Sequence, residues 1–165
     1  MGWWKWGVRC NQLSKVSTGG EFDENHPAVF VYSFRLKLIE IKNKKYQIQL
    51  WNGPGQEKYR RQSKLFVKDS DIVIFVYDIT KYDTLKALEE NRINEVKEIL
   101  GATFKWAIIG NKADLFLHMD KATTKEDVYN LAKKFGFKFR LVSAKEDITS
   151  FNNLLIELIE DCLNN

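Results

Sequence analysis

The chain has 165 residues, 44% of them hydrophobic, and its 26 basic and 22 acidic residues leave a formal net charge of +4. This length predicts one domain, residues 1–165, with enough chain to bury a substantial core. The charge is mild and mixed rather than gathered in a basic stripe, which argues against a nucleic acid as partner. No secretory segment or membrane-spanning apolar run is evident, and two cysteines fit a reducing, cytoplasmic location.

The predicted elements alternate between strands and helices along the chain. Residues 34–41 and 45–51 read as two strands joined by a polar turn at Asn43, and the apolar run at 72–77 is typical of a strand buried on both faces. Further strands are predicted at 105–110 and 138–142, and helices at 85–100, 124–135 and 150–163, the first two ending at Gly101 and Gly136. Such alternation predicts an α/β fold with a mainly parallel sheet and helices on both faces.

Two polar segments about thirty residues apart each follow a predicted strand: Asn111-Lys112-Ala113-Asp114 and Ser143-Ala144-Lys145. In an α/β sheet, ligands bind just outside the carboxyl ends of the strands, so both segments can face one small molecule. The two oxygens of Asp114 can accept from neighbouring N–H groups of guanine. The Ala144 N–H can mark the guanine oxygen, Lys145 can pack on the base, and Ser143 can brace the loop. Either segment alone is also an ordinary polar turn, but the pair predicts guanine recognition.

A third segment, Trp51-Asn52-Gly53-Pro54-Gly55-Gln56-Glu57, follows an alternating strand, and the run from Ile74 to Thr80 reads Ile-Phe-Val-Tyr-Asp-Ile-Thr. With the two base segments, these residues resemble the Ras superfamily of small GTPases, and most of all its Rab branch, over residues 22–163. The resemblance implies the Ras-like P-loop NTPase fold and GTP or GDP as the ligand. It also implies effector and regulator proteins as partners, and a role in regulating membrane traffic.

The resemblance assigns roles to three further residues. Phe22 matches the aromatic that packs edge-on against guanine, with a plain core position as an equal alternative. The Gly55 N–H would donate to the terminal phosphate. Gln56 matches the glutamine that orients the attacking water, and an exposed surface side chain is the alternative.

Residues 1–21 depart from the family pattern. Gly2 and Gly7 have the spacing of the two phosphate-loop glycines, but either Val8 and Arg9 or Cys10 and Asn11 stand where the loop Lys and Ser/Thr are expected. The central strand that precedes the loop has no counterpart, so we expect a disturbed or missing N-terminal strand. Either the tryptophan-rich start fills that slot in an altered way, or the N-terminus is not that of a complete domain.

Two substitutions concern magnesium. Asn52 replaces an Asp, and Val29 falls where the family has a Thr that closes on Mg²⁺ and the γ-phosphate. We therefore expect weak or absent Mg²⁺ binding and weak or absent GTP hydrolysis. The alternatives are a nucleotide-independent pseudo-GTPase interaction module and an incomplete gene product.

Cys162 is in register with an apolar helix face, so a core position is favoured over a lipid-modified tail, and only peripheral membrane contact stays open.

Overall fold

The computed structural model describes residues 10–25, 32–53, 67–68, 70–101, 105–118 and 125–164. In chain order the elements are α1 (Cys10–Ser17), β1 (Ser33–Ile41), β2 (Lys44–Asn52), β3 (Ile72–Asp78), α3 (Tyr82–Ala87), the π-helical turn η2 (Leu88–Arg92), α4 (Ile93–Leu100), β4 (Lys105–Asn111), the 3₁₀ helix η3 (Ala113–His118), α5 (Lys125–Phe135), β5 (Lys138–Val142) and α6 (Thr149–Leu163). Every strand and helix range predicted above is matched within a few residues, and the prediction of an α/β fold is confirmed.

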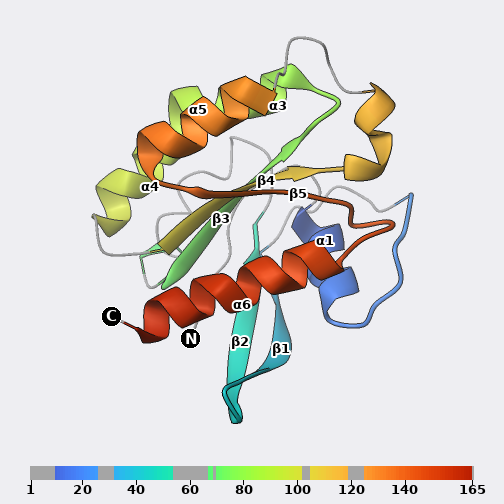
Figure 1. The fold of residues 1–165 in the computed structure, drawn as a ribbon, viewed down its shortest axis with the longest axis vertical. Coiled ribbons are helices and arrows are strands. Elements are labelled where there is room, and N and C mark those ends of the chain that lie inside the picture. The colour runs from blue at the N-terminus through green and yellow to red at the C-terminus, as the bar shows by residue number, and fades with distance from the viewer. Residues whose placement is uncertain are drawn as a thin grey trace.

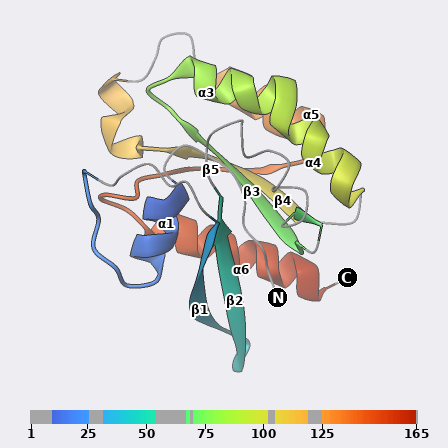
Figure 2. The same cartoon turned by 180° about the vertical axis from the view of Figure 1, so that it is seen from behind.

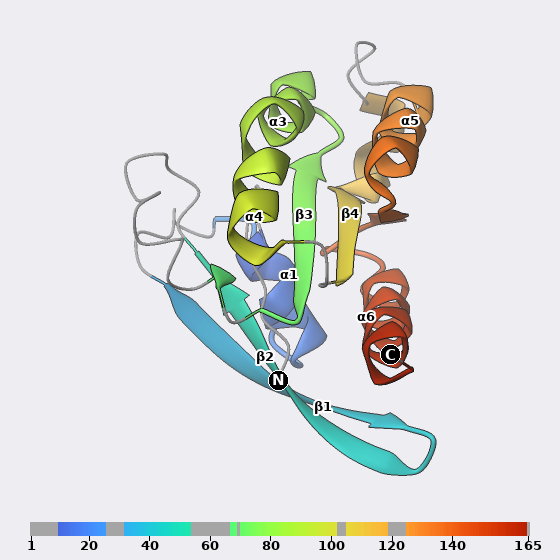
Figure 3. The ribbon, with the colours of Figure 1, turned by 90° about the vertical axis from the view of Figure 1, so that its left-hand side faces the viewer.

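Strands β3, β4 and β5 form a parallel sheet in that order. Helices α3, α4 and α5 cover one face, and α1 and α6 lie on the other side (Figures 1 and 3). The register pairs Asp78 with Asn111 and Asn111 with Val142, so the carboxyl ends of all three strands meet at one edge of the sheet.

The buried hydrophobic residues of the described ranges form two clusters, one on each face of this sheet. All seven residues of β3 are buried, as expected of a strand covered on both sides. Ile74 and Val76 point into a cluster shared with α6 and the β1–β2 pair, whereas Val73 and Phe75 point into a cluster shared with α3, α4 and α5. The alternation of side chains along β3 thus anchors both helical layers to one strand.

Strands β1 and β2 form an antiparallel hairpin whose turn residues Lys42 and Asn43 have φ of 50° and 61°. Figure 2 shows the hairpin extending away from the three-stranded sheet. Among the strands in the described ranges, β1–β2 and β3–β4–β5 are separate hydrogen-bonded ladders. The prediction of a disturbed or missing N-terminal strand falls on residues outside the described ranges and stays a prediction. Residues 1–9, on which the phosphate-loop prediction falls, lie outside the described residues.

Among the elements of the described ranges, α1 and η3 were not predicted. The long helix after β3 is also interrupted by the π-helical turn η2. Both helix-ending glycines are confirmed, because Gly101 and Gly136 adopt φ of 71° and 72°, which favours glycine at a helix end. Cys162 is partly buried against the core, in line with its predicted position.

Candidate functional site

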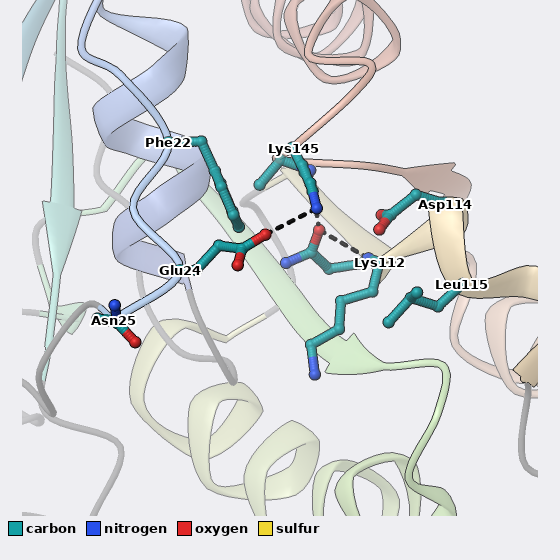
Figure 4. A pocket seen from close by; sticks show the side chains of 9 residues that line it. Phe22, Glu24, Asn25, Lys112, Asp114, Leu115 and Lys145 are labelled. Carbon is teal, nitrogen blue, oxygen red and sulfur yellow. Dashed lines mark hydrogen bonds and ion pairs between the residues drawn. The ribbon is translucent and has the colours of Figure 1, made fainter.

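A pocket of about 390 Å³ opens at the carboxyl ends of β4 and β5. Its walls are formed by Phe22, Glu24, Asn25, Asn111, Lys112, Asp114, Leu115, Ala144 and Lys145 (Figure 4). Most of the residues predicted for base recognition are therefore gathered around one cavity. Glu24, Asn25 and Leu115 belong to it as well, although nothing in the sequence pattern singled them out.

Close packing fixes the end of β4. Gly110 precedes Asn111, and a Cβ at Gly110 would lie 2.7 Å from both Leu141 Cδ2 and Tyr77 Oη. A larger residue there would force these side chains to move, which favours glycine just before the pocket. The buried Asn111 side chain then accepts hydrogen bonds through Oδ1 from the N–H of Lys112 at 2.8 Å and of Ala144 at 3.2 Å. Asn111 therefore joins the two predicted segments.

The bond to Asn111 bears on the role predicted for Ala144. The Ala144 N–H is expected to mark a guanine oxygen, but in this structure it already donates to Asn111 Oδ1. A base oxygen would have to share that amide with Asn111 or displace it. The role of Ala144 toward guanine stays a prediction.

Ser143 is buried behind the pocket wall rather than in it. Its hydroxyl donates to Asp114 Oδ1 at 2.6 Å and accepts from the N–H groups of Lys145 at 3.2 Å and Glu146 at 2.9 Å. A hydrogen bond to a charged acceptor is short and strong, so this one orients the Asp114 carboxylate. The predicted bracing role of Ser143 has a geometric basis here.

Lys112 has φ of 71°, a left-handed conformation that is unusual for a residue with a side chain. Its ammonium pairs with the buried Asp78 at the end of β3. Asp78 also accepts from the N–H and hydroxyl of Thr80, at 3.0 and 2.6 Å. Burial alone would raise the pKa of Asp78, but the hydrogen bonds from Lys112 and Thr80 outweigh it and hold the pKa below its ordinary value.

The opposite wall comes from the segment after α1. Phe22 lines the pocket and also packs against the core, and its edge-on contact with guanine stays a prediction. Glu24 accepts a hydrogen bond from the Lys145 ammonium at 2.7 Å. This contact, more than any other charge nearby, raises the pKa of Lys145.

One residue of the magnesium prediction, Asn52, is described. This side chain is 1% exposed, and its Nδ2 donates to Ser14 Oγ at 2.7 Å. A neutral amide binds Mg²⁺ less favourably than the carboxylate that the resemblance expects, and weak or absent Mg²⁺ binding stays a prediction. Ser14 in turn donates to the Asn11 carbonyl at 3.1 Å. Within the described part of the chain, no three His, Cys, Asp or Glu side chains lie close enough to hold a metal. Val29, Gly55 and Gln56 lie outside the described residues, and their roles stay predictions.

The chain is similar to known proteins over most of its length. The model of the Ras family matches residues 10–164. The chain is 32% identical over 126 residues to the Ras-related protein Rab-21 of Geodia cydonium, which covers 76% of this chain and 54% of that protein. It is 29% identical to the Ras-related protein RABA5b of Arabidopsis thaliana, covering 95% of this chain and 70% of that protein.

Rab-21 of Homo sapiens is 28% identical over 127 residues, which is 77% of this chain and 55% of that relative. The chain thus spans little more than half the length of the Rab-21 relatives. No helix within the described ranges has the length and apolar content to cross a membrane.

The family match begins at Cys10, the first residue of α1, and runs through the pocket residues to the end of α6. The chain belongs to the Ras family, as a Rab-like member of the Ras superfamily of small GTPases.

Proposed function

We propose that this chain binds GTP and GDP through the pocket of Figure 4, hydrolyses GTP weakly or not at all, and takes part in regulating intracellular membrane traffic through partner proteins. The observation that carries the proposal is the Asp114 carboxylate in the pocket wall, oriented by Ser143. A carboxylate can only accept hydrogen bonds. Guanine offers a ring N–H beside an amine, whereas adenine offers a ring acceptor beside its amine, so Asp114 favours guanine.

A competition experiment tests this base preference. Fluorescent GDP bound to the protein should be displaced by GDP and GTP and resist displacement by ATP. Asp114→Asn should weaken guanine binding by about tenfold or more, because it removes hydrogen bonds to a charged acceptor. Glu146→Gln, which removes a neighbouring exposed charge from the same loop, is the matched control and should bind normally. Equal displacement by ATP would reject guanine specificity.

Weak hydrolysis is the second part of the proposal. Phosphoryl transfer depends on charge stabilisation by a loop lysine and a metal. The sequence has no Lys or Ser/Thr in either phosphate-loop register, and the Asn52 amide is engaged by Ser14. We expect GTP and GDP affinities within about tenfold of each other. Chelation of Mg²⁺ should change GDP affinity little, and a large loss on chelation would contradict this part.

A second candidate function, a nucleotide-independent interaction module, is favoured by the outer face of the β1–β2 hairpin. Phe34, Leu36 and Leu38 project from β1 and are 49%, 50% and 72% exposed. Phe34 stacks on Trp51 of the neighbouring strand with ring centroids 4.8 Å apart. A contiguous exposed apolar strip of this kind often marks a protein-binding surface.

Hydrogen exchange separates the two candidates. A working switch requires the γ-phosphate to bind the two conformations of the protein with different affinity. Exchange across residues 24–34 and 52–66 is measured without nucleotide, with GDP and with a non-hydrolysable GTP analogue. Protection by the analogue alone would support an ordinary nucleotide switch. Exchange that is identical with GDP, with the analogue and without nucleotide would support the interaction module.

A further inference from the structure

The segment that carries Phe22 and Glu24 is held on α1 at two points. The N–H of Gly20 donates to the Lys15 carbonyl at 2.9 Å, and the N–H of Asp23 donates to Gln12 Oε1 at 3.1 Å. Gln12 is 1% exposed, so its amide is a rigid acceptor. We call residues 20–25 the α1 arm. Because its backbone is fixed from inside the domain, the position of Glu24 beside the pocket is preset.

Glu24 of the α1 arm pairs with Lys145 in the loop after β5. Glu24 Oε1 lies 2.7 Å from Lys145 Nζ, and both side chains line the pocket. The Lys145 N–H donates to Ser143 Oγ, and that hydroxyl donates to Asp114. In Figure 4, Lys145 reaches from its loop toward Glu24, close to the ring of Phe22. The ion pair thus extends this chain of contacts from Asp114 to the α1 arm.

We propose that Glu24 is a positioning residue of this pocket, whose carboxylate holds the Lys145 side chain across the cavity and so slows the release of a bound guanine nucleotide. The proposal rests on the proposed function, because it presumes that the pocket takes the base. Glu24 need not touch the ligand. It acts by keeping the apolar stem of Lys145 opposite Phe22, where a planar base can be held between them.

The expected effect is modest because the pair is partly exposed to water, at 69% for the Glu24 side chain and 49% for Lys145. Exposed ion pairs contribute little, so we expect Glu24→Gln to speed GDP release by about two- to fivefold. Salt screens an exposed pair. The release rate of the unmodified protein should therefore rise with salt toward that of Glu24→Gln, whose own rate should change less.

Stopped-flow displacement of fluorescent GDP by excess GDP measures the release rate directly. Glu21→Gln is the matched control, since it removes the same charge from the α1 arm at an exposed residue for which no ion pair is seen within the described ranges. The ratio of the two variants' rates isolates the ion pair from the general change in charge. Melting temperatures of both variants should stay close to that of the unmodified protein.

A double-mutant cycle with Lys145→Met asks whether Glu24 acts through Lys145. If it does, Glu24→Gln has no further effect on release when Lys145 is already replaced. Equal acceleration in both backgrounds, or equal rates for Glu24→Gln and Glu21→Gln, would overturn the positioning role while leaving guanine binding intact. Failure of the unmodified protein to bind any guanine nucleotide would overturn both this inference and the proposed function.

Discussion

The Ser143 hydroxyl donates to Asp114 Oδ1 across 2.6 Å and so couples the loop after β5 to the loop after β4. Ser143 is 3% exposed and does not line the pocket, yet it fixes the carboxylate on which base recognition would depend. A carboxylate with one oxygen held in this way is preorganised, which lowers the entropic cost of binding a ligand.

Ser143→Ala should therefore weaken guanine-nucleotide binding by about tenfold, since hydrogen bonds to charged groups contribute about 1.5–3 kcal/mol and Asp114 remains present. Isothermal titration with GDP measures the change. Ser150→Ala is the control, because the Ser150 hydroxyl also donates to a carboxylate, that of Asp147, at 2.7 Å but away from the pocket. Equal losses in both variants would show that Ser143 acts only through general stability.

Asp78 should make stability depend on pH. Its pKa is lowered in the folded protein, so its contribution is complete above the ordinary value of 3.8 and is lost as pH falls through the folded value. Asp78→Asn leaves Lys112 without its partner and should cost about 3 kcal/mol near neutral pH. Urea unfolding of the unmodified protein and of Asp78→Asn should be measured across the acidic range. The difference between their free energies of unfolding should shrink only below pH 3.8. A constant difference would contradict this account.

Gly110→Ala tests the close packing beneath the pocket. The added methyl would lie 2.7 Å from Leu141 Cδ2 and 2.9 Å from Ile79 Cγ2, so these side chains or the backbone that carries them must shift. Overpacking of this kind costs about 1–3 kcal/mol, and the shift should also displace Asn111 and weaken nucleotide binding. Denaturant unfolding and titration together check both effects. A variant with normal stability and normal affinity would show that β4 tolerates the methyl.

Asn52→Asp restores the residue type that the family resemblance expects, and we predict that it destabilises the protein. A carboxylate cannot donate to Ser14 and would be buried at a side chain that is 1% exposed. The expected loss is about 1–3 kcal/mol, unrelieved by added Mg²⁺. Thermal unfolding with and without the ion is the measurement, and recovery on adding Mg²⁺ would show that a metal does fit there.

Leu38→Glu and Leu50→Glu distinguish the two faces of the hairpin. Leu38 is 72% exposed and Leu50 is 0% exposed. The first change should alter unfolding free energy by no more than about 0.5 kcal/mol, whereas the second should prevent folding, because it buries an unpaired charge. Circular dichroism on heating is sufficient to tell them apart. A large loss from Leu38→Glu would mean that the outer face is covered within the molecule.

The strands of the parallel sheet were predictable because burial on both faces forces a continuous apolar run, as in β3. Helix α1 could not be predicted from the sequence, because its buried face is mostly polar. Gln12, Ser14 and Ser17 are buried beside Leu13, and such a face has no apolar period of 3.6 residues. A helix of this kind is recognised only once its hydrogen-bond partners are known.

The candidate site also has a part that the sequence predicted and a part that it did not. The pocket positions of Asn111 and Ala144 were predictable from the strand ends, because the last residues of parallel strands lie at one edge of the sheet. The pairing of Lys112 with Asp78 depends on the register of β3 and β4, which no local pattern specifies. The contact of Glu24 with Lys145 spans 121 positions of sequence and follows only from the tertiary fold.

The division of the strands into two ladders has a consequence for how the protein opens. The β1–β2 ladder is closed by a short turn, and its link to the β3–β4–β5 ladder within the described residues runs through side chains such as Ile39, Leu50 and Leu155. β4 is hydrogen-bonded on both sides, to β3 and to β5, whereas the turn end of the hairpin is exposed at Lys42 and Asn43. The amides at this turn should therefore exchange through local opening, while those of β4 wait for global unfolding.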